Sequence, residues 1–206
     1  MRRLLAVAFA ILLPMAAGAD EAQPRLVTLG GTVTEIAFAL GLGDHVVGVD
    51  QSSLYPEAAR ALPQVGYYRA VSAEGILSLR PTLVVASEEA GPPAALELVR
   101  EAGVEILRLP SAPIAEAARA RIRLFAQRAG VAAAGEALVG RMDAELAAAQ
   151  AIAACVRAEP TPAIFLFARG GGSVAAAGGG TAADALLEMA GASNAFGASY
   201  RGYRPV

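Results

Sequence analysis

Short runs of apolar, β-branched residues alternate with helical stretches through the first half of the chain, and this alternation constrains the fold more than any other feature. The predicted strands are 26–29, 45–49, 82–86 and 104–109, and the predicted helices are 32–40, 72–79 and 92–102. Such an order is typical of a parallel sheet, because parallel neighbours need a long crossover connection. The sequence therefore predicts an α/β lobe. Thr32 and Glu35 have the spacing of a capping box, which places the start of the first helix at Thr32.

Two helical stretches, 114–129 and 133–156, then follow each other with only Gly130 and its neighbours between them. At 1.5 Å per residue the second stretch would be about 36 Å long, which is long for a connection inside an α/β lobe. It is either a long connector between two lobes or one member of an ordinary pair of packed helices.

The α/β pattern returns after Pro160 and Pro162. A strand is expected at 163–168, a loop at 170–172 and a helix at 181–190. A single strand and helix cannot bury a core by themselves. We therefore expect a second lobe that is incomplete, so that it either packs on the first lobe or belongs to a truncated sequence.

The N-terminal residues have the pattern of a secretory signal peptide. Arg2 and Arg3 precede an apolar stretch, 4–15, which is too short to span a bilayer, and small residues at 17 and 19 form a cleavage site. A buried N-terminal helix is the alternative. No later segment reaches 18 apolar residues without a charge, so we expect an exported protein without a membrane span.

Charge and side-chain chemistry exclude several function classes. The 17 basic and 19 acidic residues give a net charge of −2, which argues against a nucleic-acid surface. His45 is the only histidine and Cys155 the only cysteine, so neither a Cys/His zinc cluster nor an internal disulfide is expected. Glycine-rich stretches at 30–31, 170–172 and 178–180 match no phosphate-binding motif. An exported α/β enzyme built on those stretches is the alternative from another class.

The segment 65–69, which reads Val-Gly-Tyr-Tyr-Arg, lies between the second predicted strand and the helix at 72–79. Loops at this position line the ligand crevice of a doubly wound sheet. If the segment is extended, Tyr67 and Arg69 point to one side and Tyr68 to the other, so that a phenol and a guanidinium face the same ligand. In the alternative, one tyrosine packs against the core and Arg69 is solvated.

Motifs that run through most of the chain match one family of transport proteins. They lie at 25–35, 47–50, 55–57, 62–67, 72–81, 86–93, 170–172, 180–185 and 190–191, with Asn194. With them the chain resembles the haem-binding periplasmic proteins of bacterial haem ABC transporters. The motifs around Tyr67 and Gly180-Thr181 point to this subgroup, whereas the wider class also transports siderophores and cobalamin.

The resemblance implies two Rossmann-like α/β lobes joined by one rigid long helix, with the second lobe incomplete. The expected divisions are a signal peptide at 1–19, an N-terminal lobe at 20–112, a helical connector at 113–159 and a partial C-terminal lobe at 160–206.

The resemblance also implies functional residues. Tyr67 corresponds to the tyrosine that ligates the haem iron in the family, and Tyr68 is the neighbouring alternative. Tyrosinate is a known axial haem ligand, and Arg69 would either support the phenolate or pair with a haem propionate. Some relatives add a histidine from the second lobe, where this chain has Arg169, a weaker candidate for a propionate. His45 is expected to be structural or exposed.

Glu74 corresponds to a glutamate that docks on the membrane permease in the wider class, although an acid there is also favoured by the helix dipole. The resemblance therefore implies a monomeric, non-enzymatic protein of the periplasm. Its transported ligand would be haem, its partner an ABC permease of the inner membrane, and nucleic acid is not expected to bind.

Overall fold

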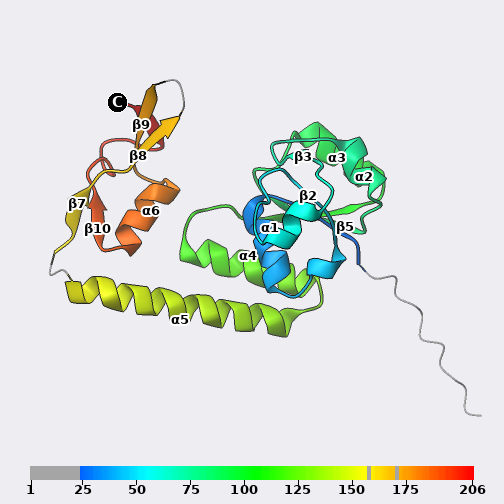
Figure 1. Ribbon diagram of the computed structural model, residues 1–206, viewed down its shortest axis with the longest axis horizontal. Helices are drawn as coiled ribbons and strands as arrows, with labels where there is room; N and C mark the ends of the chain where they lie inside the picture. The colour runs from blue at the N-terminus through cyan, green and yellow to red at the C-terminus, as the bar shows by residue number, and fades with distance from the viewer. Residues whose placement is uncertain (1–23, 157–158, 170–171) are drawn as a thin grey trace, which may run out of the picture.

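The computed structural model describes residues 24–156, 159–169 and 172–206. The predicted signal peptide therefore lies outside the described residues. One α/β lobe lies at the first end of a long helix, and a smaller group of strands with one helix lies at the other end (Figure 1).

The first lobe contains the predicted parallel sheet. Its strands are β1 (Leu26–Leu29), β2 (Val46–Val49), β5 (Leu83–Ser87) and β6 (Glu105–Leu109), in the order β2-β1-β5-β6. Every neighbouring pair is parallel. Three short helices and two 3-10 turns connect the strands: α1 (Gly31–Ala39), α2 (Ala73–Ser78), α3 (Pro93–Glu101), η1 (Gly43–His45) and η2 (Glu57–Ala61). The α/β prediction is confirmed.

Both faces of the central strands β1 and β5 are buried, which explains why these strands read as largely apolar runs. Leu83 and Val85 of β5 belong to one hydrophobic cluster, whereas Val84 and Ala86 belong to the cluster on the opposite face. This division follows from the alternation of side chains along a strand.

The start of α1 differs from the prediction. The helix begins at Gly31 with Gly30 as its N-cap, and no side chain of its own caps it, so the capping box of Thr32 and Glu35 is wrong. Asp50 and Ser52, which follow β2, accept hydrogen bonds from the amides of Gly30 and Gly31 at 2.9 and 3.2 Å instead. Because these acceptors follow a different strand, the spacing of residues around the start of α1 does not reveal them.

The two central helices combine both expected alternatives. α4 (Ala115–Arg128) packs against the first part of α5 (Ala132–Val156), where Gly135 lets the two backbones approach because a side chain there would collide with Ala126. Phe125 and Val139 join the cluster of the first lobe. The later turns of α5 run on toward the smaller group of strands (Figure 1).

That group contains more strands than predicted. Its elements are β7 (Thr161–Ala163), β8 (Leu166–Arg169), β9 (Ser173–Ala177), α6 (Ala182–Met189), β10 (Ala192–Asn194) and β11 (Tyr203–Pro205). The expected single strand at 163–168 is wrong, because β7 pairs in parallel with β10 whereas β8 pairs antiparallel with β9. β11 adds to the other edge of β9. The predicted helix at 181–190 is confirmed as α6, which Thr181 caps.

Candidate functional site

A pocket of about 400 Å³ lies at the carboxyl edge of the parallel sheet. All four strands end at this pocket, which is where open α/β sheets bind ligands. Its lining residues are Gly30, Gly31, Thr32, Val33, Glu35, Ser52, Tyr68, Ser87, Glu89, Leu109, Pro110, Ser111 and Arg121.

Asp50 is the polar centre beneath this edge. Its side chain is fully buried and accepts five hydrogen bonds. The donors are the amides of Gly30, Ser52 and Tyr68 and the hydroxyls of Ser52 and Ser53, at 2.6–3.2 Å. Asp50 therefore ties the start of α1 to the segment that contains the two tyrosines.

That segment is a tight hairpin. β3 (Gly66–Tyr67) pairs antiparallel with β4 (Ala70–Val71), and Tyr68 and Arg69 form the turn between them. Gly66 has a φ of +102°, and a Cβ there would lie 2.9 Å from the carbonyl oxygen of Ala70. Because the chain turns at Tyr68, the segment is not extended, and the expected placement of Tyr67 and Arg69 on one side and Tyr68 on the other does not apply.

The two tyrosines have different surroundings. Tyr68 lines the pocket and packs against the hydrophobic cluster that contains Val84 and Ala86. Its hydroxyl donates a hydrogen bond to Glu89 at 3.3 Å. Burial and a hydrogen bond with Tyr67 raise the pKa of Tyr68 to about 12, so this phenol is neutral at ordinary pH. Tyr67 is 43% exposed and contacts the Tyr68 ring edge-on, with ring centroids 4.7 Å apart.

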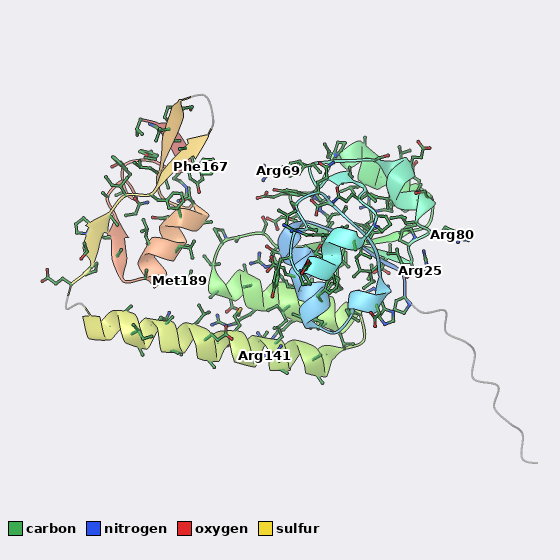
Figure 2. The ribbon with its side chains drawn as sticks, viewed as in Figure 1. Arg25, Arg69, Arg80, Arg141, Phe167 and Met189 are labelled. Atoms are coloured by element: carbon green, nitrogen blue, oxygen red, sulfur yellow. The ribbon has the colours of Figure 1, made fainter. Side chains whose placement is uncertain are left out.

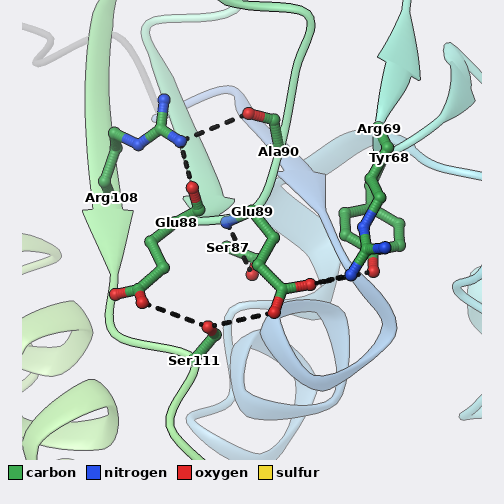
Figure 3. Close-up of polar contacts among 8 residues, drawn as sticks. All are labelled: Tyr68, Arg69, Ser87, Glu88, Glu89, Ala90, Arg108 and Ser111. Carbon is green, nitrogen blue, oxygen red and sulfur yellow. Dashed lines mark hydrogen bonds and ion pairs between the residues drawn. The ribbon is translucent and has the colours of Figure 1, made fainter. Parts of the chain in front are cut away.

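Arg69 is held by Glu89, from the loop after β5. The two side chains form an ion pair, and the guanidinium also lies 5.1 Å from the centroid of the Tyr68 ring (Figure 3). The hydrogen bond from Arg69 holds the pKa of Glu89 below its usual range. The hydroxyl of Ser111 contacts the Glu89 carboxylate from the other side, at 3.4 Å. Tyr68 therefore packs as one alternative expected, but Arg69 is ion-paired rather than simply solvated.

Arg69 lies on the side of the first lobe that faces the second group of strands, and Phe167 and Met189 lie on the opposing side of that group (Figure 2). A second pocket, lined by residues of α4, α5 and α6 that include Arg119, Asp143 and Met189, lies between the two parts of the molecule.

Of the predicted site residues that the structure describes, only Tyr68 lines the pocket; Tyr67 and Arg69 lie beside it in the hairpin, and the others lie apart from it. Glu74 is exposed in the first turn of α2, which Ser72 caps through a hydrogen bond from the Gly75 amide at 3.1 Å. His45 is partly buried in η1 and does not line the pocket. The side chains of Arg169 and Cys155 lie outside the described residues.

The structure adds residues that the sequence did not single out. Glu89 and Ser111 reach the hairpin from the ends of β5 and β6, and Arg121 reaches the pocket from α4. These residues lie far along the chain from the two tyrosines, so no short sequence motif could connect them with the site. Of the part of the chain that the structure describes, no helix is both long and apolar enough to cross a membrane.

Comparisons with known proteins agree with this architecture. Residues 26–206 match the family model described as periplasmic binding protein. The chain is similar to the periplasmic haem-binding protein BhuT, solved in complex with two haems, at 42% identity and a TM-score of 0.83, covering 89% of this chain and 70% of that one. It is also similar to the periplasmic haem-binding protein RhuT from Roseiflexus sp. RS-1, in apo form, at 43% identity and a TM-score of 0.83 over the same shares.

A curated relative, the vitamin B12-binding protein of Vibrio vulnificus (strain CMCP6), is 39% identical over 82 residues, which are 40% of this chain and 30% of that protein. The match therefore spans about a third of that relative's length. These similarities, with a parallel sheet, a long helix and a pocket at the sheet edge, lead to one conclusion. The chain belongs to the periplasmic binding protein family, whose members serve transport as binding components and are not enzymes.

Proposed function

We propose that this protein captures haem beside the hairpin 66–71 and delivers it to an ABC permease of the inner membrane. The observation that carries the proposal is the pair of unlike tyrosines in a chain similar to haem-binding proteins. Tyr67 is exposed, whereas Tyr68 is held as a neutral phenol by burial and its hydrogen bonds. Tyr67 is therefore the better candidate for the iron ligand.

The chemistry of such a site follows from the charges around it. Ferric haem is bound by tyrosinate in known proteins, and the charge of the iron favours the ionised phenol. Because its side chain remains 54% exposed in the ion pair with Glu89, Arg69 can reach either the phenolate or a propionate of the ligand. Arg169 is a further candidate for a propionate.

Glu74 is our candidate for contact with the permease. Its side chain is exposed at the start of α2 and belongs to no ion pair among the described residues. An exposed carboxylate in the first helical turn is available to an arginine of a docking partner.

Cobalamin is the second candidate ligand, because the curated relative from Vibrio vulnificus is a vitamin B12-binding protein. Absorption titrations of the purified protein with hemin and, separately, with cyanocobalamin distinguish the two. We expect hemin to give a saturating, high-spin tyrosinate-type spectrum and cyanocobalamin to give no saturable change. Saturable binding of cyanocobalamin alone would replace haem by cobalamin as the ligand.

A further inference from the structure

We propose that Arg121 binds a carboxylate of the ligand in the pocket at the carboxyl edge of the sheet. This inference rests on the proposed function, because it takes haem as the ligand and one of its propionates as the carboxylate. It concerns a residue of α4 that lies outside the hairpin 66–71.

Arg121 has unused hydrogen-bonding capacity inside the pocket. Its NH1 group donates to the carbonyl oxygen of Pro110 at 3.0 Å, but its Nε is buried and has no acceptor among the described residues. A guanidinium has five N–H donors in a planar fork. The Nε is covered by protein, so the terminal N–H groups that do not bond Pro110 are the donors that a ligand in the pocket would meet.

The other arginines near this edge already have acceptors, and the half-exposed Arg69 is the candidate cation at the hairpin rather than inside the pocket. Arg69 is paired with Glu89, and Arg108 donates to the carbonyl oxygens of Glu88 and Ala90 (Figure 3). Arg121 is the only cationic side chain among the described residues that line the pocket. Arg121 forms no ion pair with the described residues that line the pocket. The nearby Glu88 carboxylate accepts a hydrogen bond from the Ser111 hydroxyl at 3.2 Å.

Arg121 can bind an anion with two oxygens, although the carboxylates of Glu35 and Glu89 line the same pocket. A guanidinium binds a carboxylate through two parallel hydrogen bonds. The Ser87 hydroxyl lines the same pocket and accepts from the Glu89 amide at 3.3 Å, so its own proton is free to donate. Thr32 adds a second hydroxyl to the lining. Tyr68 lines the pocket and contacts the Tyr67 ring, so the pocket borders the hairpin that carries the candidate iron ligand.

Hemin and its dimethyl ester, in which both propionates are neutral, test the proposal. Each is titrated into the full chain, into Arg121→Gln and into Arg121→Lys, with the absorption spectrum as readout and circular dichroism as the check on folding. Arg123→Gln is the matched control, because Arg123 lies on the same helix but is exposed and paired with Glu136.

We expect Arg121→Gln to weaken hemin binding by about ten- to a hundredfold while leaving the binding of the ester unchanged. Arg121→Lys should lose less, because it keeps the charge but not the fork, and Arg123→Gln should bind both ligands as the wild type does. All variants should keep the same ligand spectrum at saturation, since the iron ligand is unaltered.

Two results would overturn the proposal. Equal hemin affinity in the wild type and both Arg121 variants would remove Arg121 from the site, and so would an equal loss of hemin and ester binding. Either result would leave haem as the ligand. Absence of hemin binding by the wild-type protein would overturn the proposed function as well.

Discussion

The two parts of the molecule, one at each end of the long helix α5, bury their apolar side chains to very different extents. In the first lobe, the strands β1 and β5 are buried on both faces, and Leu96 of α3 is 2% exposed. In the second part, Ile164 and Leu166 are 54% and 57% exposed, and Leu186 of α6 is 60% exposed. Both parts contain strands and a capped helix, so secondary structure alone does not determine how well a region is stabilised.

The difference bears on the site, because every described residue that lines the pocket belongs to the first lobe or to α4. The hairpin 66–71 is held by a buried carboxylate, Asp50, and by contacts with a buried cluster. A ligand-binding residue needs such support to keep its geometry. In the second part of the molecule more apolar side chains are exposed, so a side chain on its surface has less of this support.

The largest expected difference between the two parts is in amide hydrogen exchange. Burial contributes roughly 25 cal/mol per Å² of apolar surface, so the second part should open with a free energy lower by about 3 kcal/mol or more. We expect amides within 161–206 to exchange at least about a hundredfold faster than those of β1 and β5. Exchange followed by mass spectrometry measures this. Equal protection in both parts would mean that exposure of apolar side chains is a poor guide to local stability here.

A matched pair of leucine substitutions sharpens the same comparison. Leu96→Ala removes a buried side chain from the first lobe and should lower the free energy of unfolding by about 2–5 kcal/mol. Leu186→Ala removes a side chain that is 60% exposed, and we expect a change of at most about 0.5 kcal/mol. Urea unfolding curves give both values. If Leu186→Ala cost as much as Leu96→Ala, the surface of α6 would be covered in solution.

The sequence predicted the first lobe well because its central strands are buried on both faces and therefore read as largely apolar runs. It predicted the second part poorly. β9 consists largely of alanine, and residues 164–165 separate two strands that belong to different sheets although the apolar run is continuous. Strand pairing is a long-range property, and nothing in residues 163–168 specifies which partner each residue takes.

For the site, local sequence identified the tyrosines but not their partners. The turn at Tyr68-Arg69 depends on Gly66 and on the Asp50 acceptor, and Glu89 approaches Arg69 from a different strand end. Arg121 is more distant still, since it reaches the pocket from α4. These contacts follow from the order of the strands in the sheet, which the spacing of residues does not give.

Three tyrosine substitutions test whether the ligand contact belongs to the first lobe. Tyr67→Phe should abolish the tyrosinate-type spectrum with hemin, because phenylalanine has no oxygen to ligate iron. Tyr203→Phe, on β11 of the second part and 48% exposed, should leave it unchanged. Tyr68→Phe should largely preserve the spectrum. Loss of the spectrum in Tyr68→Phe but not in Tyr67→Phe would make Tyr68 the ligand.

The smallest expected effect concerns acid stability, where the two parts should behave alike. Glu89 in the first lobe and Asp184 in the second both have a lowered pKa, the first through its hydrogen bond with Arg69 and the second through hydrogen bonds from Asn194 and the Gly180 amide. A lowered pKa means that the stabilisation is present above the pKa of the unfolded chain, about 4 for these groups, and is lost as the pH falls through the folded value.

Because the Glu89 carboxylate is 45% exposed, its ion pair should contribute less than about 1 kcal/mol. Glu89→Gln should therefore lower the urea midpoint slightly at pH 7, and the difference from the wild type should shrink as the pH falls below the ordinary range of a glutamate. A larger loss at pH 3 than at pH 7 would contradict this sign and would require a role for Glu89 in its neutral form.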